Sequence, residues 1–218
     1  MAALPPDPAI TRAALVQRLL GWGDGRRRVV AFAGPPGAGK STVVERLRSE
    51  LEAARPGLAA ILPLDGFHFD DVVLELRGDR ARKGAPHTFD VDGFAAMLVR
   101  LQRDAGRDIA VPVFDRAIEI ARAGARIIAG TVRIVLAEGN YLLLDRPGWR
   151  DLAPLFDLTI MVTASEANLV DRLRRRWLGY GYTEAQLEAK MAGNDLPNMR
   201  LVLAGSRPAD HVLRSDAD

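Results

Sequence analysis

Residues 34–41 have the types and spacing that chemistry on a phosphate requires. Gly34, Gly37 and Gly39 precede Lys40 and Ser41, which fits the pattern G-x-x-x-x-G-K-[ST]. Such glycines let successive backbone N–H groups point at one anion, and the helix that follows adds its positive end. Lys40 would reach the β- and γ-phosphates of a nucleotide, and the Ser41 hydroxyl would bind Mg²⁺. The expected nucleotide contacts are Gly34, Pro35, Pro36, Gly37, Ala38, Gly39, Lys40, Ser41 and Thr42.

Two acids directly follow apolar runs of the sequence. Glu138 follows residues 131–137, and Asp65 follows residues 59–64. Mg²⁺ prefers oxygen ligands, so we expect Glu138 to act with Ser41 at a metal ion or its waters. Asp65 is placed to accept a proton from an attacking hydroxyl. The plainer alternatives are a surface carboxylate or helix cap for Glu138, and a capping residue in a tight turn for Asp65.

Basic and polar residues elsewhere are further candidates. Arg172 and Arg176 are four positions apart, so they share one face of an expected helix. A guanidinium there can meet the charge that phosphoryl transfer spreads over the equatorial oxygens, and a solvated basic face is the alternative. The candidate substrate contacts are His68, His87, Asp90, Asp115 and Arg116, for which a structural role is the alternative.

The elements that must position these residues alternate along the chain. Apolar periodicity predicts helices at 9–22, 40–54, 91–104, 165–178, 183–192 and near 197–204. Apolar runs predict strands at 29–33, 59–64, 131–137 and 158–163, with an edge strand at 212–213. We expect one domain over 1–218, with an N-terminal helix within about 9–25, a substrate-binding excursion at about 66–116 and a helical lid at about 172–192.

Alternation of strands and helices predicts the fold class. It implies an α/β protein with a mainly parallel sheet covered by helices on both faces, a three-layer α/β/α arrangement. Ligands of such sheets lie outside the carboxyl ends of the strands. Residues 34–41, Asp65 and Glu138 all fall at such ends, so we expect them to meet at one site.

Composition narrows the partners. The 30 basic residues comprise 27 Arg and 3 Lys, and the net charge of +2 does not favour nucleic-acid binding. No apolar run approaches the ~18 residues of a membrane span, so we expect no membrane partner. Residues 1–10 show no secretory signal and the chain has no Cys, which together favour a cytoplasmic protein.

Several further stretches resemble the P-loop kinases that include uridine kinase, phosphoribulokinase and bacterial type I pantothenate kinase. Beside the phosphate loop (residues 34–41), they are Leu64-Asp65-Gly66-Phe67-His68, Arg82 to Asp90, Val111-Pro112-Val113-Phe114-Asp115, Val135 to Tyr141 and the Arg-rich stretch after 171. The resemblance implies a P-loop NTPase fold with ATP and Mg²⁺ as cofactors.

The same resemblance implies individual roles. Asp65 would be the base, Lys40 and Ser41 would lie on the phosphates, and Glu138 would lie near Mg²⁺. Arg172 or Arg176 would be the lid arginine, and Tyr141 would belong to the substrate-binding set. A homodimer is common in this family.

The substrate follows less directly. Phe114, Asp115 and Arg116 stand where pantothenate kinases present a Tyr and a His to their ligand, which argues against pantothenate. Thr88-Phe89-Asp90-Val91 is a partial match to the Asn-Phe-Asp-His-Pro stretch of uridine kinases. The chain is more similar to a bacterial branch of nucleoside-kinase-like proteins and fructose transport-system kinases, which implies a fructokinase.

Two classes of function therefore remain open. The first is an ATP-dependent kinase that phosphorylates a hydroxyl of a sugar, nucleoside or pantothenate-like metabolite. The second is a regulatory nucleotide-binding protein without a small-molecule acceptor. The absence of an Asn-Lys-x-Asp motif argues against a GTPase, and the polar segment at 66–92 favours a second small ligand.

Overall fold

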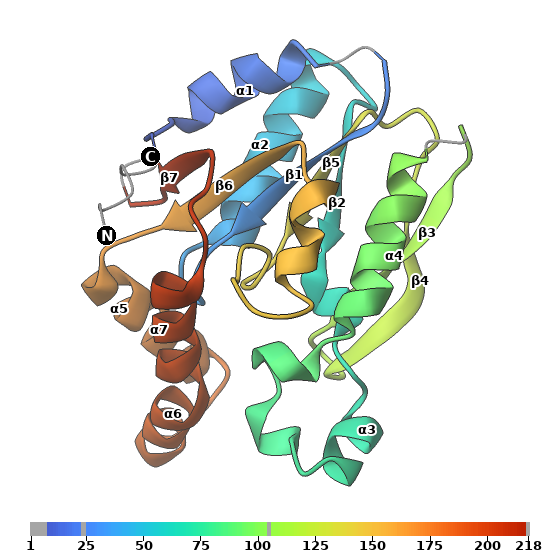
Figure 1. Cartoon of the computed structure of the whole chain (residues 1–218). Helices are drawn as coiled ribbons and strands as arrows, with labels where there is room; N and C mark the ends of the chain where they lie inside the picture. Colours follow the sequence, from blue (N-terminus) through green and yellow to red (C-terminus); the bar gives the residue numbers. More distant parts are fainter. Residues whose placement is uncertain (1–7, 23–24, 104–105, 217–218) are drawn as a thin grey trace.

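A parallel β-sheet forms the centre of the molecule in this computed structural model, which describes residues 8–22, 25–103 and 106–216. Among these residues the sheet has five strands in the order β2-β5-β1-β6-β7 (Figure 1). The pairs β2–β5, β5–β1, β1–β6 and β6–β7 are all parallel. The strands are β1 (Arg28–Ala33), β2 (Ala59–Pro63), β5 (Ile134–Glu138), β6 (Leu158–Thr163) and β7 (His211–Arg214).

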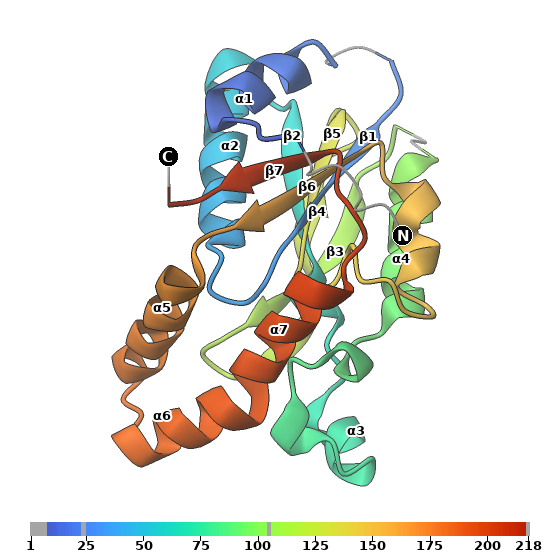
Figure 2. The same cartoon turned by 60° about the vertical axis from the view of Figure 1, so that its left-hand side comes forward.

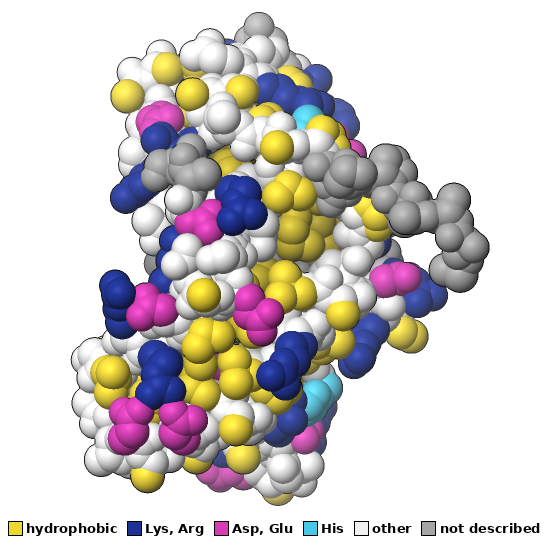
Figure 3. Space-filling view, turned by 90° about the vertical axis from the view of Figure 1, so that its left-hand side faces the viewer, with side chains coloured by type: hydrophobic (Ala, Val, Ile, Leu, Met, Phe, Trp, Pro, Cys, Tyr) yellow, Lys and Arg dark blue, Asp and Glu magenta, His cyan; other side chains and the backbone are white. Residues whose placement is uncertain are grey.

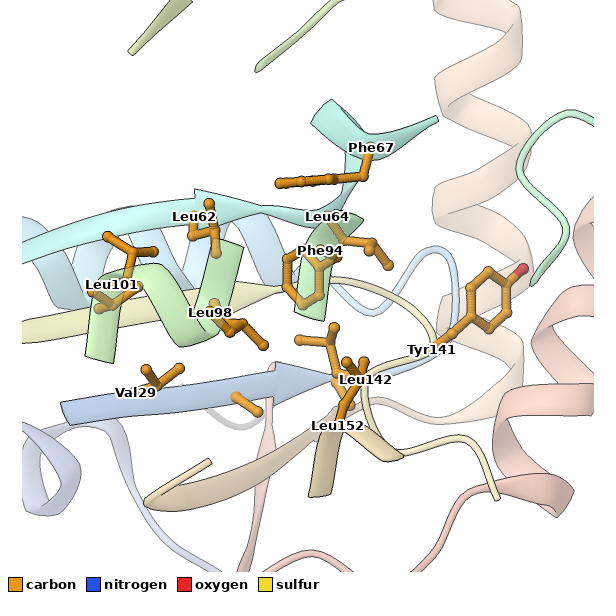
Figure 4. Packing of buried hydrophobic residues seen from close by; sticks show 14 of the residues in the cluster. Val29, Leu62, Leu64, Phe67, Phe94, Leu98, Leu101, Tyr141, Leu142 and Leu152 are labelled. Atoms are coloured by element: carbon orange, nitrogen blue, oxygen red, sulfur yellow. The ribbon is translucent and has the colours of Figure 1, made fainter. Parts of the chain in front are cut away.

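Helices cover both faces of this sheet, which confirms the predicted three-layer α/β/α arrangement. Alternate residues of β1 enter two separate cores, as a buried strand requires. Val30 and Phe32 pack with α1 (Arg12–Leu20) and α2 (Lys40–Ala54) on one face. Val29, Ala31 and Ala33 pack on the other face with α4 (Val91–Gln102) and the 3₁₀ segment Arg150–Leu155. Figure 4 shows this second core between the sheet and α4.

Two groups of elements extend beyond the carboxyl end of the sheet (Figures 1 and 2). One is the lid, which consists of α5 (Glu166–Gly179), α6 (Glu184–Lys190), the π-helical segment Met191–Asp195 and α7 (Leu196–Gly205). The other follows β2 and contains α3 (Asp71–Leu76) with the short 3₁₀ segments Leu64–Phe67, Arg80–Arg82 and Pro86–Thr88. The phosphate loop lies at the same end of the sheet, between β1 and α2.

The first two lid helices, α5 and α6, each begin at a side-chain cap. Ser165 accepts a hydrogen bond from Asn168 N at the start of α5. Thr183 and Gln186 form a reciprocal capping box at the start of α6, which satisfies two otherwise free backbone donors. These caps explain why the helices predicted at 165–178 and 183–192 begin where they do.

An antiparallel ribbon was not predicted from the sequence. It consists of β3 (Ile109–Asp115) and β4 (Ile120–Ile128), with a register shift between Val111 and Val113. Most side chains of β4 are exposed, so the ribbon lacks the apolar alternation that identifies a half-buried strand. It lies beside the turn after β2 and completes one wall of the site.

The other boundaries agree closely with expectation. The strand predicted at 131–137 begins three residues later, at Ile134. The predicted helix at 91–104 ends at Gln102, and its last residue, Asp104, lies outside the described residues. Residues 23–24 of the expected N-terminal helix segment (about 9–25) also lie outside the described residues. The same is true of residues 1–7, which belong to the stretch 1–10 that was searched for a secretory signal. Among the described helices, none combines the length and the apolar character needed to cross a bilayer.

Candidate active site

The phosphate loop is held in a shape that only glycine permits at two points. Gly34 has a φ of +156° and Gly37 a φ of +82°. A Cβ on Gly34 would lie 2.1 Å from Val162 O in β6, and one on Gly37 would lie 2.7 Å from Leu169 O in α5. Both positions therefore combine an unusual backbone conformation with a close approach to another backbone segment. The loop is positioned by β6 and α5, at the amino end of α2.

Lys40 lies buried at the first position of α2. Its Nζ donates to Gly34 O and Pro35 O, both at 3.0 Å, so it spans the loop that it is expected to serve. Burial lowers the pKa of Lys40 to about 8, although the charges of Glu138 and Asp65 act in the opposite direction. Lys40 of the phosphate loop therefore interacts electrostatically with Asp65, the expected base, and with Glu138, the expected metal ligand.

Ser41 and Glu138 meet across the sheet end. Ser41 Oγ donates to Glu138 Oε1 at 3.3 Å. Burial, followed by the charge of Asp65, raises the pKa of Glu138 to about 7. Within the described ranges no group of three His, Asp or Glu residues could hold a metal ion alone. The hydroxyl and carboxylate oxygens fit Mg²⁺ as a partner of nucleotide phosphates, since this ion is usually bound through one or two carboxylates, waters and substrate phosphates.

Asp65 occupies the turn after β2, next to the end of β5. Parallel pairing places Pro63 beside Glu138, so the two acids approach each other. Gly66 allows the ribbon to come close, because a Cβ there would lie 2.5 Å from Pro112 O. Arg116 Nη2, from the turn of the ribbon, donates to Asp65 Oδ2 at 2.6 Å. The side chain of Asp65 is 33% exposed and remains accessible to a ligand.

His68 is fixed beside Asp65. Its Nδ1 lies 2.8 Å from Asp65 O, and its ring packs on Phe89 and Phe114 at centroid distances of 4.0 and 5.0 Å. Burial lowers the pKa of His68, which favours the neutral imidazole at pH 7. The other ring nitrogen is thus suited to hydrogen bonding rather than to holding a charge.

Two pockets meet at Asp65. A larger one of about 430 Å³ lies between the phosphate loop, the segment after β2 and the lid. A smaller one of about 180 Å³ includes Ser41 and Glu138. Asp65, Phe114 and Arg116 line both. A group bound in the larger pocket and a metal–phosphate group bound in the smaller one would therefore both lie beside Asp65.

The two lid arginines have different surroundings. Arg172 Nη1 donates to Ser215 Oγ at 2.8 Å and lies 3.5 Å from Gly37 O, so it joins the C-terminal segment to the phosphate loop. Arg176 lines the larger pocket, and its guanidinium lies 5.5 Å from the Trp177 ring centre. Its charge also contributes to lowering the pKa of Lys40. Arg172 and Arg176 both lie on α5, four positions apart, and of the two only Arg176 lines the larger pocket.

The other two arginines of α5 are paired with acids. Arg174 contacts Glu184 and Glu188 of α6, and Arg175 Nη2 lies 2.9 Å from Asp171. Figure 3 shows basic and acidic side chains next to one another on this side of the molecule. The Arg-rich stretch therefore does not form one uniform basic surface.

Four expected substrate contacts are not among the residues that line either pocket. Asp90 caps α4 by accepting from Gly93 N at 2.8 Å, and His87 pairs with Asp79. Asp115 pairs with Arg122. Tyr141 is buried, and its hydroxyl donates to Gly84 O at 2.6 Å (Figure 4). Their positions give them structural roles in this part of the chain, whereas His68 and Arg116 do line the larger pocket.

Sequence reasoning missed much of the lid side of this pocket. Asp195 is buried and accepts a hydrogen bond from Trp177 Nε1. The side chains of Asn194 and Asn198 reach the backbone at Lys83 and Gly84. Polar residues in a π-helical segment are a signal of function, but a π-helix cannot be recognised from periodicity. The other unpredicted lining residues include Arg80, Glu119, Asn140, Tyr180, Tyr182 and Lys190.

Comparisons with known proteins agree with this fold. The chain is 31% identical over 196 residues to "Putative uridine kinase C227.14" of Schizosaccharomyces pombe, which covers 87% of this chain and 83% of that protein. It is 37% identical over 190 residues to "Uncharacterized protein YggC" of Escherichia coli, covering 86% and 78%. The crystal structure of a "putative fructose transport system kinase" from Silicibacter sp. TM1040 superposes with a TM-score of 0.84 at 42% identity, covering 94% of this chain and 99% of that one. No family model matches the chain.

Proposed function

The chain belongs to the family of P-loop kinases that includes uridine kinase and type I pantothenate kinase, and from this premise we propose that it transfers the γ-phosphoryl group of ATP to a hydroxyl of a small metabolite. The observation that carries the proposal is the place of Asp65. It lines the pocket with Ser41 and Glu138 and also the larger pocket under the lid. A carboxylate between two such pockets can serve an acceptor on one side and a phosphoryl group on the other.

Each residue then has a defined task. The acceptor oxygen attacks the γ-phosphorus, the bond from that phosphorus to the ADP oxygen breaks, and Asp65 takes the hydroxyl proton. Lys40, the loop amides and Arg176 stabilise the charge on the phosphoryl oxygens. Ser41 and Glu138 would hold Mg²⁺, which neutralises phosphate charge when bound. Trp177 and Tyr180 of the lid would exclude water from the larger pocket.

A sugar is the acceptor class that we favour. The 42% identity to a protein named as a fructose transport system kinase supports this choice. The pocket also combines aromatic side chains with Asn and Asp groups, which suits a molecule bearing several hydroxyls. Fructokinase activity is thus the first activity to test.

An acceptor panel tests the proposal. We expect ADP formation from Mg·ATP to increase at least tenfold over the background hydrolysis when a suitable sugar, nucleoside, hydroxy acid or sugar phosphate is added. Mass spectrometry of the acceptor should show a gain of one phosphate. Nucleotide binding with no acceptor-dependent turnover across the panel would contradict the kinase and favour the regulatory alternative, which a nucleotide-dependent change in protein partners would support.

We also predict a narrow pH window for nucleotide binding. Burial raises the pKa of Glu138 to about 7, so its carboxylate is lost as the pH falls below that value. Burial lowers the pKa of Lys40 to about 8, so its charge is lost as the pH rises above that value. Mg·nucleotide needs both charges. Affinity should therefore be highest between pH 7 and 8 and fall by up to about tenfold per pH unit on either side.

Calorimetry with a non-hydrolysable Mg·ATP analogue from pH 6 to 9 measures this window. In Glu138→Gln, the fall in affinity below pH 7 that is caused by protonation of Glu138 should disappear. Any fall that remains on the acid side then belongs to protonation of the nucleotide's own phosphate. The alkaline limb should persist in that variant, because it belongs to Lys40. An unchanged affinity from pH 7 to 9 in the unsubstituted protein would contradict the assignment to Lys40.

A further inference from the structure

The three lysines of this chain all lie at the two pockets or the phosphate loop between them. The chain uses Arg at 27 of its 30 basic positions. Lys40 begins α2, and both Lys83 and Lys190 line the larger pocket. Lysine differs from arginine in that its ammonium is a compact charge with three donors and a flexible stem. In a chain that otherwise uses arginine, the lysines therefore lie where small ligands would bind.

Lys83 is already engaged. Its Nζ lies 2.5 Å from Asp71 Oδ1 and donates to Glu119 O at 2.7 Å. Asp71 also pairs with Arg80 Nη2 at 2.8 Å. These contacts connect the segment after β2 to the turn of the ribbon, so Lys83 has a structural explanation.

Lys190 has no such explanation. Within the described part of the chain, its ammonium forms no ion pair and no hydrogen bond, and its contact is with the Trp177 ring at 5.2 Å. Burial lowers the pKa of Lys190; the charges of Asp195 and Glu119 act to raise it, and those of Arg80 and Arg176 act to lower it. A partly buried charge without a partner is costly, and a bound anion would remove that cost.

The charges around Lys190 favour an anion rather than a cation. The cations that line the larger pocket outnumber the acids. Asp65 is paired with Arg116, Arg80 and Lys83 share Asp71, and Asp195 accepts from Trp177. Among the described residues that line the pocket, Arg176 and Lys190 are then the cations without an ion pair. Glu119, although it acts to raise the pKa of Lys190, is not within ion-pair distance of it. The lining cations are Arg80, Lys83, Arg116, Arg176 and Lys190, and the acids are Asp65, Glu119 and Asp195.

We propose that the acceptor of this kinase carries an anionic group, a phosphate or a carboxylate, which Lys190 binds at the lid end of the larger pocket. The inference rests on the proposed function, since it concerns the molecule that receives the phosphoryl group. Arg176 serves the transferred phosphoryl group, and Lys190 with Arg80 serves the anion that the acceptor already bears. The inference thus narrows the acceptor class proposed above: it favours a sugar phosphate, or a hydroxy acid, over free fructose.

Matched acceptor pairs test this directly. Fructose is compared with fructose 1-phosphate and fructose 6-phosphate, and glycerol with D-glycerate. We expect at least one anionic member to be used with a KM at least tenfold below that of its neutral partner. Lys190→Gln should raise that KM by about 10- to 100-fold, as expected for a lost charge-assisted hydrogen bond. The KM for ATP should stay within about twofold, and Lys190→Arg should recover most of the loss.

Arg175→Gln is the control, because it removes a lid charge that is 78% exposed and does not line the pocket. It should leave all these constants unchanged. Preferred use of a neutral acceptor, or an unchanged KM for the anionic acceptor in Lys190→Gln, would overturn the anion site while leaving the kinase intact. No turnover of any acceptor would count against the kinase itself.

A second experiment tests whether Lys190 binds an anion, and it does not require turnover of any acceptor. With three lysines in the chain, acylation by an amine reagent can be followed at each one by peptide mass spectrometry. With Mg·ADP saturating the phosphate loop, addition of inorganic phosphate or D-glycerate should slow acylation of Lys190 at least fivefold. Equimolar glycerol should not. Equal labelling of Lys190 with and without the anions would overturn the proposal.

Discussion

Replacing Asp65 by Asn is expected to reduce phosphoryl transfer by about 10²- to 10⁴-fold, the usual contribution of a general base. Asn has nearly the same shape and can still accept a hydrogen bond from Arg116, which lies 2.6 Å from Asp65 Oδ2. It cannot accept the hydroxyl proton. The loss should therefore appear in kcat, measured by single-turnover kinetics with saturating Mg·ATP and acceptor. The Kd for a Mg·ATP analogue should change by no more than a few-fold.

Asp92→Asn is a matched control. Asp92 is an exposed acid near the start of α4 and lines neither pocket, so its substitution should leave kcat unchanged. If Asp65→Asn retained most of the turnover, the assigned base would be wrong. If it instead lost nucleotide affinity by 100-fold, Asp65 would belong to the metal site with Glu138, whose pKa its charge raises.

Arg116 determines how the Asp65 result should be interpreted. It contacts Asp65 and lines both pockets. The guanidinium therefore occupies one side of the Asp65 carboxylate at the place where the two pockets meet. The acceptor must share Asp65 with Arg116 or displace it, so Arg116 is placed to orient the base as well as to contact the substrate.

The architecture could be predicted because its signals are local. The apolar run before Gly34 is the buried strand β1, and the amphipathic pattern from Lys40 onward is α2 with the same bounds. The ribbon of β3 and β4 could not be predicted, because its outer faces meet solvent and Pro112 interrupts its first strand. Its position depends on contacts with the turn after β2, and such contacts leave no periodic trace in the sequence.

The candidate site divides in the same way. The positions of Glu138 and Asp65 could be predicted from the sequence, because each follows a strand and parallel strands bring their carboxyl ends together. Asp90, expected from its residue type, and Tyr141, expected from the family resemblance, do not line either pocket. Asp90 and Tyr141 have polar groups, but each group is used by a neighbouring backbone atom. Lys190 gave no signal in the sequence beyond the rarity of lysine.

Replacing Lys40 by Met is expected to lower kcat/KM for Mg·ATP by about 10²- to 10³-fold or more, because an electrostatic contact to the transferred phosphoryl group is lost. Burial lowers the pKa of Lys40 from 10.5 to about 8 in the folded protein, so the charged amine destabilises the fold at neutral pH. Above pH 8 the folded protein loses this proton while the unfolded chain keeps it to about 10.5. The stability of the parent relative to Lys40→Met should therefore increase from pH 8 upward.

Urea unfolding of both proteins between pH 7 and 9.5 measures that difference. The expected change up to pH 9.5 is about 2 kcal/mol, since this pH lies about 1.5 units above the pKa of Lys40 in the folded protein and one unit corresponds to about 1.36 kcal/mol. Arg48→Met on the exposed side of the same helix is the control and should show no such pH dependence. A difference that stays constant with pH would contradict the buried amine. Loss of activity together with the pH-dependent difference would mean that the buried charge of Lys40 lowers the stability of the fold and serves to bind the nucleotide phosphates.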